Sequence, residues 1–189
     1  MDSGTHLVMG LGLAGLAYVD PVVSSNHALS TAVLIATVLG SQAPDTDGFL
    51  RLRGNAVYIR NHRGISHSIP FLFIWTSVIT FLLSSLFGNI SVGHLALWTF
   101  IAVSIHVFTD LFNTYGTQGF RPFTEKWISL NIIHIFDPFI FSSHVIAILL
   151  WMAGVSAPQI IFTVLYLLIG LYYAWRISIK MLIQKRVPK

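Results

Sequence analysis

The sequence contains no cysteine, which excludes disulfides and thiolate metal ligands. Charged residues make up only 10% of its 189 residues, whereas soluble domains carry about a quarter. Hydrophobic residues make up 54%. So few charges cannot cover a globular surface, so we expect lipid to solvate much of the chain. The length predicts a single membrane domain over residues 1–189.

The N-terminus lacks a positively charged stretch, because the first Lys or Arg in the chain is Arg51. A cleaved signal peptide carries such a stretch before its apolar segment. We therefore expect the first apolar segment to belong to the mature fold.

Apolar segments are the main feature that the sequence does contain. They are residues 7–19, 28–43, 69–87, 94–112, 139–155 and 160–179. Crossing a bilayer takes about 20 apolar residues, so the third, fourth and sixth segments predict full spans and the fifth is at the short limit. The first two predict either short helices or a hairpin that does not cross fully. The predicted fold class is an all-α membrane protein with about six transmembrane or partly inserted helices.

The basic residues all fall on one predicted side of the membrane. Six segments place both termini on the same side as residues 44–68 and 113–138, and place residues 20–27, 88–93 and 154–158 on the other. The first side holds every Lys and Arg: Arg51, Arg53, Arg60, Arg63, Arg121, Lys126, Arg176, Lys180, Lys185, Arg186 and Lys189. The positive-inside rule makes this side cytoplasmic. Anchoring to anionic lipid explains the basic C-terminal end, and we predict no nucleic-acid partner.

Asp and His residues gather at the same side. Asp45 and Asp47 are spaced so that both carboxylates can reach one cation, although Pro and Gly neighbours also favour a plain exposed turn. His62 and His67 follow, on either side of Arg63. An arginine beside a metal would suit an anionic substrate.

A further His–Asp pair lies near the end of the fourth segment. His106 and Asp110 share one helix face, and ionisable residues inside a membrane usually face a partner or a cavity. The alternative is a buried, hydrogen-bonded pair. His6 enters the first segment from the same side, and Asp137 precedes the fifth, where it also suits a helix cap. The predicted metal ligands are His6, Asp45, Asp47, His62, His67, His106, Asp110 and Asp137.

His and Asp ligands predict a divalent ion, zinc first and manganese second, and the surplus over four allows one or two ions. The predicted function is metal-dependent hydrolysis of an amphiphilic anionic substrate, a phospholipid or other lipid phosphoester. The predicted catalytic residues are Asp45, His67 and Asp110, with Arg63 or Arg121 holding the anion. Two alternatives stay open: a transporter for metal ions or protons, and a membrane regulator with a structural metal.

An ordered set of short motifs runs along nearly the whole chain. The motifs are Met1-Asp2 with Thr5-His6, Pro44-Asp45-Thr46-Asp47, His62-Arg63-Gly64 with His67-Ser68, His106 with Asp110, Tyr115-Gly116, and Asp137-Pro138. In this set the sequence resembles the YdjM-like family of bacterial membrane-bound, metal-dependent hydrolases. The resemblance implies a multi-pass protein of the bacterial inner membrane with hydrolase activity, and names no substrate.

Overall fold

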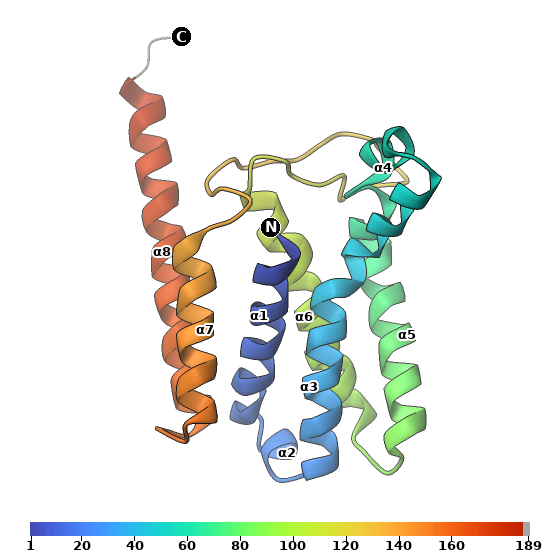
Figure 1. Ribbon diagram of the computed structural model, residues 1–189, viewed down its shortest axis with the longest axis vertical. Coiled ribbons are helices and arrows are strands. Elements are labelled where there is room, and N and C mark those ends of the chain that lie inside the picture. The colour runs from blue at the N-terminus through green and yellow to red at the C-terminus, as the bar shows by residue number, and fades with distance from the viewer. Residues whose placement is uncertain (187–189) are drawn as a thin grey trace.

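The computed structural model describes residues 1–186, which contain helices and no extended strand (Figure 1). Its elements are α1 (Ser3–Leu16), η1 (Ala17–Val19), α2 (Pro21–Ser24), α3 (His27–Gln42), η2 (Ala43–Arg53), α4 (Asn55–Asn61), η3 (Ile65–His67), α5 (Ile69–Phe87), α6 (Val92–Phe112), α7 (Pro138–Met152) and α8 (Pro158–Arg186). Lys189, part of the basic C-terminal end, lies outside the described residues. We call the end of the bundle where α1 begins the loop end, and the opposite end the turn end (Figure 1).

Three helices, α5, α6 and α8, are long and apolar enough to cross a bilayer. They correspond to the three segments predicted as full spans, and α5 has the predicted bounds. The last helix runs past residue 179 because the Lys, Arg and Gln residues there are good helix formers. α1 and α7 are shorter apolar helices. With 14 residues, α1 rises only about 21 Å, less than the ~30 Å hydrocarbon core.

Capping side chains determine where several helices begin. The Asp2 carboxylate accepts a hydrogen bond from the Thr5 backbone N–H, and Asn26 caps α3 in the same way. Asp137 accepts from two backbone N–H groups at the start of α7. Such caps satisfy N–H groups that have no partner within the helix, and each stabilises by about 0.5–2 kcal/mol. Two of them, Asp2 and Asp137, fix helix starts at the loop end.

The helix α3 is central, with α1, α5 and α6 packed around it, while α7 and α8 form a pair against α1. Two hydrophobic cores follow from this arrangement. One, around Leu29, Val33 and Leu95, joins α3, α5 and α6, and the other, around Ile140 and Phe162, joins α1, α7 and α8. The outer helices α5 and α8 leave most of their apolar surface exposed, as lipid contact requires.

A glycine allows α1 to approach α3 closely. A Cβ atom on Gly10 would lie 2.9 Å from the Thr37 carbonyl oxygen, closer than real Cβ atoms come. This close approach carries the first turns of α1, including His6, to the interior of the loop end.

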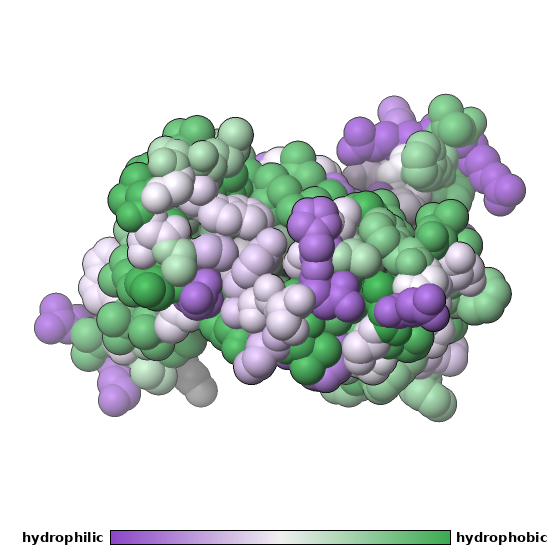
Figure 2. All heavy atoms as spheres, turned by 90° about the horizontal axis from the view of Figure 1, so that it is seen from below, coloured by the Kyte–Doolittle hydropathy of each residue, from purple (hydrophilic) through white to green (hydrophobic). Residues whose placement is uncertain are grey.

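Polar segments cover the loop end. The predicted loop 44–68 contains η2, α4 and η3, and the connection 113–137 lies across the same end (Figure 1). The Gln118 N–H donates to the Arg63 carbonyl at 2.9 Å, and the Arg176 guanidinium donates to the Ile132 carbonyl at 2.7 Å. The turn end, by contrast, is mostly hydrophobic or weakly polar, with few strongly hydrophilic side chains (Figure 2).

Candidate metal centre

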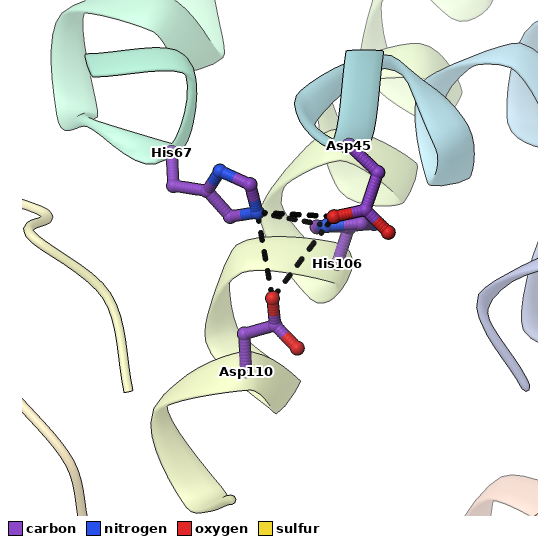
Figure 3. A group of neighbouring side chains, drawn as sticks. All are labelled: Asp45, His67, His106 and Asp110. Carbon is purple, nitrogen blue, oxygen red and sulfur yellow. Dashed lines mark hydrogen bonds and ion pairs between the residues drawn. The ribbon is translucent and has the colours of Figure 1, made fainter. Parts of the chain in front are cut away.

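Four side chains from three elements point toward one another at the loop end (Figure 3). Asp45 comes from η2, His67 from η3, and His106 and Asp110 from the last turns of α6. One potential ligand atom from each lies within 4.8 Å of the other three. We call these four residues the ligand group. The first and last of them, Asp45 and Asp110, lie 65 residues apart along the chain, so only folding brings the group together.

The distances within the ligand group are short and nearly uniform. The Nε2 atoms of His67 and His106 are 3.2 Å apart. His67 Nε2 lies 3.6 Å from Asp45 Oδ1 and 3.4 Å from Asp110 Oδ2. His106 Nε2 lies 3.7 Å from each of the same two oxygens. Four donor atoms therefore surround one small central volume.

Hydrogen bonds on the outer side of both imidazoles assign their tautomers. His106 Nδ1 is 2.6 Å from the Ser41 carbonyl oxygen, so it must carry a proton. His67 Nδ1 is 3.0 Å from Ser66 Oγ, which donates its own proton to Asp47 at 2.8 Å. His67 Nδ1 is therefore also the donor. Both Nε2 lone pairs then face each other across 3.2 Å, an arrangement that a cation between them would stabilise.

The two carboxylates of the ligand group present unsatisfied oxygens to the same volume. Asp110 Oδ1 accepts from Asn113 Nδ2 at 3.1 Å and contacts the amino group of Met1. Asp110 Oδ2 and Asp45 Oδ1 are buried and accept no hydrogen bond within residues 1–186, although Arg63 Nε forms an ion pair with Asp110 Oδ2 at 3.2 Å. A buried carboxylate oxygen without a donor is costly, and a bound cation would remove that cost. The residues present thus fit a metal ion.

The protonation states of Asp45 and His67, the two members of the ligand group outside the long helices, also suit metal binding. Burial raises the pKa of Asp45, but the neighbouring imidazoles of His67 and His106 hold it well below its usual value. Burial lowers the pKa of His67 in spite of the carboxylates of Asp45 and Asp47. Near neutral pH these groups are an anionic carboxylate and a neutral imidazole, the forms that ligate metals.

A second group, Asp45, Asp47 and His62, lies beside the first and shares Asp45 with it. Asp47 Oδ1 is 2.8 Å from His62 Nδ1, and Oδ2 accepts from the Arg63 N–H and from Ser66 Oγ, each at 2.8 Å. Both oxygens of Asp47 are therefore engaged by protein donors. This makes Asp47 a residue that orients His62 and, through Ser66, His67.

Two of the predicted ligands lie outside both groups. His6 stacks on His106 with ring centroids 3.7 Å apart, and its Nε2 is 3.3 Å from Asp110 Oδ1. Through these contacts His6 helps to hold His106 and Asp110 in position. Asp137 uses one oxygen to cap α7, and the other accepts from Tyr172 Oη at 2.7 Å. The structure thus places Asp137 in its alternative role as a helix cap.

The predicted anion-binding role of Arg63 is corrected by its contacts. Its side chain is buried, and Nη1 and Nη2 donate to Asn113 Oδ1 and the Met1 carbonyl, each at 3.0 Å. Its Nε lies 3.2 Å from Asp110 Oδ2. The guanidinium therefore fixes Asp110, and each of its three nitrogens already has a contact within the protein, although Arg63 is also among the residues that line the pocket described below. The other predicted anion holder, Arg121, pairs with Glu125 at 2.9 Å and lines a different pocket.

A pocket of about 490 Å³ opens beside the ligand group. Asp45 and His62 line it, together with Arg51, Tyr58 and Tyr115. Asp45 is the one member of the ligand group that is partly exposed, so it connects the group to this pocket. Sequence reasoning missed Arg51 and Tyr58, because a Tyr seven residues after an Arg carries no signal until η2 and α4 bring them together.

Comparisons with known proteins agree with these features. The chain matches the family described as YdjM inner membrane protein over residues 1–183. It is also similar to the protein titled "Uncharacterized protein YfhP" from Bacillus subtilis (strain 168), with 51% identity over 187 residues. That match covers 99% of this chain but only 57% of the relative's length. No solved structure matches the chain significantly.

Proposed function

Because this chain belongs to the YdjM inner membrane protein family, we propose that its ligand group is the active centre of a membrane-embedded, metal-dependent hydrolase. The proposed substrate is a phospholipid or another lipid phosphoester, which enters the pocket from the membrane surface. The observation that carries the proposal is the meeting of two imidazole lone pairs and two carboxylate oxygens beside an open pocket, where neither oxygen accepts a hydrogen bond within the described residues.

The proposed ion is zinc. Zinc sites have ligand distances of about 2.0–2.2 Å, which in a tetrahedron separates the ligand atoms by about 3.3–3.6 Å. The five separations given above for the ligand group, 3.2 to 3.7 Å, lie within about 0.1 Å of this range. Manganese is the second choice, since it prefers more oxygen ligands than this group offers. Asp47 and the other outer residues would hold the ligands in place, so we propose one ion per chain.

An ion held by these four side chains would supply Lewis-acid chemistry to a water molecule and a phosphoryl group if it accepts a further ligand from the side of the pocket. The protein's own residues would do the rest. His62 is partly exposed in the pocket, and its Nδ1 is held by Asp47 at 2.8 Å. This leaves Nε2 to accept the proton as water attacks phosphorus. The P–O ester bond breaks, and the departing alkoxide takes that proton back from His62.

The proposal is tested with purified protein in an uncharged detergent. The protein is stripped with a chelator, reloaded with zinc or manganese, and incubated with phospholipids labelled in the phosphate and in the acyl chains. We expect the reloaded protein, and not the stripped one, to release product by cleaving a phosphoester bond. Equal product release by stripped and reloaded protein, or none from either, would contradict the hydrolase.

Replacing the proposed base separates catalysis from metal binding. In His62→Asn the side-chain amide can keep the contact with Asp47, but the proton-accepting Nε2 is lost. We expect kcat to fall by about 10²–10⁴-fold, the usual effect of losing a general base, with metal content unchanged. Steady-state kinetics and metal analysis of the same samples measure the two effects. A variant that hydrolyses at the wild-type rate would exclude His62 as the base.

We also propose that the loop end faces the cytoplasm, which the side assignment of the basic residues supports. Since the chain has no cysteine, single cysteines report the topology without background. Ser25→Cys lies at the turn end and Thr124→Cys in the connection across the loop end, both at exposed positions. A membrane-impermeant maleimide should label only the first in intact cells and both after permeabilisation. The reverse pattern would invert the topology.

The transporter alternative has less support. A pathway needs polar groups through the whole bilayer. The buried His144 lies in α7, but its Nδ1 bonds to the Ile140 carbonyl of its own helix at 2.7 Å, and its Nε2 has no hydrogen-bond partner within residues 1–186. It does not extend the ligand group toward the turn end, whose surface is mostly hydrophobic or weakly polar (Figure 2).

A further inference from the structure

The pocket beside Asp45 has an arginine in its wall that the chain does not neutralise. Arg51 is exposed and donates from Nη2 to Tyr58 Oη at 3.0 Å. Its guanidinium carbon lies 4.2 Å from the centre of the Tyr58 ring. Ion pairs within residues 1–186 use the Met1 amino group, Arg63, Arg121 and several histidines, but none uses Arg51. Its charge is therefore positioned by Tyr58 and open to a ligand.

Tyr58, which positions Arg51, is itself held in place. The Tyr58 ring packs against His62 with centroids 4.6 Å apart, and His62 is fixed by Asp47. A planar guanidinium held against an aromatic ring loses little freedom when it binds an anion, and its fork suits phosphate oxygens. The arginine thus stands beside the proposed base, in the same pocket.

Neither of the two carboxylates that line the pocket, Asp2 and Asp45, forms an ion pair with Arg51 within the described residues. The Asp2 oxygens are engaged by the backbone N–H and the hydroxyl of Thr5. Asp45 directs Oδ1 toward the imidazoles of His67 and His106. An arginine over the Tyr58 face also occupies the place that a cationic ligand would need. The pocket therefore favours an anion.

Apolar side chains complete the lining. Ile59, from α4, is 65% exposed and Ile135, from the connection, is 41% exposed, and both line the pocket. Only a short segment separates α4 from α5, which is long and apolar enough to enter the bilayer. Exposed apolar side chains at this depth suit the glycerol and acyl part of a lipid.

We infer that Arg51, positioned by Tyr58, recognises the phosphate of an amphiphilic phosphate ester bound in the pocket beside Asp45. The apolar part of this ligand lies along Ile59 and Ile135. The inference deepens the proposed function and rests on it in one respect, that the bound ester is the molecule to be hydrolysed. Recognition itself requires neither the ion nor turnover.

Binding of dihexanoyl phosphatidic acid to the full chain in maltoside detergent tests the inference, with calorimetry as the readout. The variant is Arg51→Gln, and the matched control is Arg53→Gln, an exposed arginine two residues later that does not line the pocket. Removing a hydrogen bond to a charged group changes affinity by about tenfold or more. We expect Arg51→Gln to weaken binding about tenfold and Arg53→Gln to leave it within about twofold. Equal loss in both variants, or none in either, would overturn the inference.

Further ligands separate the sources of the phosphate and the two proposals. Inorganic phosphate should bind much more weakly than the lipid, and equal affinity would overturn the apolar half of the site. Dihexanoylglycerol, which lacks phosphate, should show no difference between wild type and Arg51→Gln. Arg51-dependent binding without any hydrolysis would overturn the hydrolase and support the recognition site. Hydrolysis with equal lipid affinity in wild type and Arg51→Gln would support the hydrolase and overturn the recognition site.

Discussion

Replacing His106 with Asn should empty the metal centre while leaving the bundle folded. The Asn amide can reproduce the donor at Nδ1, which bonds to the Ser41 carbonyl at 2.6 Å, but it has no counterpart to Nε2. Structural zinc sites bind with about 10–16 kcal/mol over four ligands, or about 3 kcal/mol for each. The loss of one ligand then weakens zinc binding by about 10²–10³-fold. If the ion is catalytic, hydrolysis falls with it.

Metal analysis after dialysis against a buffered zinc solution measures this effect. Wild-type protein should retain one ion per chain, and His106→Asn close to none. His67→Asn is a second ligand variant outside the membrane helices, and it should behave in the same way. The matched control is His144→Asn, which removes an equally buried histidine whose Nδ1 also bonds to a carbonyl. Full metal content in His106→Asn, or an equal loss in His144→Asn, would contradict the ligand group.

Replacing Gly116 with Ala should destabilise the connection that lies across the loop end. Gly116 has φ +71°, and a Cβ atom there would lie 2.7 Å from the Ile128 carbonyl carbon. A left-handed conformation costs an alanine about 1–2 kcal/mol, and displacing the packed backbone adds about 1–3 kcal/mol. We expect the free energy of unfolding to fall by about 3 kcal/mol, which lowers the Tm by about 6–12 °C at this chain length.

The same variant should weaken metal binding, because Gly116 belongs to the turn that Asn113 organises. Asn113 Oδ1 accepts from the Tyr115 and Gly116 N–H groups, and its Nδ2 donates to Asp110. Gly119→Ala is the matched control, since a Cβ atom there meets only Thr117 Oγ1 at 3.7 Å. Thermal unfolding in detergent, followed by tryptophan fluorescence with and without zinc, compares the two. A Gly116→Ala variant as stable as Gly119→Ala would contradict this account.

The helices of this fold were predictable because lipid imposes a simple rule on length and hydrophobicity. The segments predicted as full spans, residues 69–87, 94–112 and 160–179, all lie in helices long and apolar enough to cross a bilayer. The short helices α2 and α4 were not predicted, because each has fewer than eight residues and carries no periodic pattern. The number of helices that cross the membrane stays a prediction.

The residues of the ligand group were also named from the sequence, since the paired spacings of Asp45 with Asp47 and of His106 with Asp110 are visible there. The sequence does not predict which atoms of these side chains face the centre of the ligand group. That depends on outer contacts such as those of Ser41 and Ser66, whose partners come from distant segments. For the same reason Arg63 was assigned to the substrate, although its donors are used inside the protein.

The position of the ligand group has a consequence for how the protein is made. Asp110 lies two residues before the end of α6, and Asp45 and His67 lie in segments between helices. A charged residue at the centre of an inserting helix costs about 2.5–3.5 kcal/mol, and this cost falls toward the helix ends. The helix α6 can therefore enter the bilayer during synthesis without a charge at its middle. The ligands can meet only after α6 has been synthesised, so under the proposed function no ion can bind to the complete ligand group before that point.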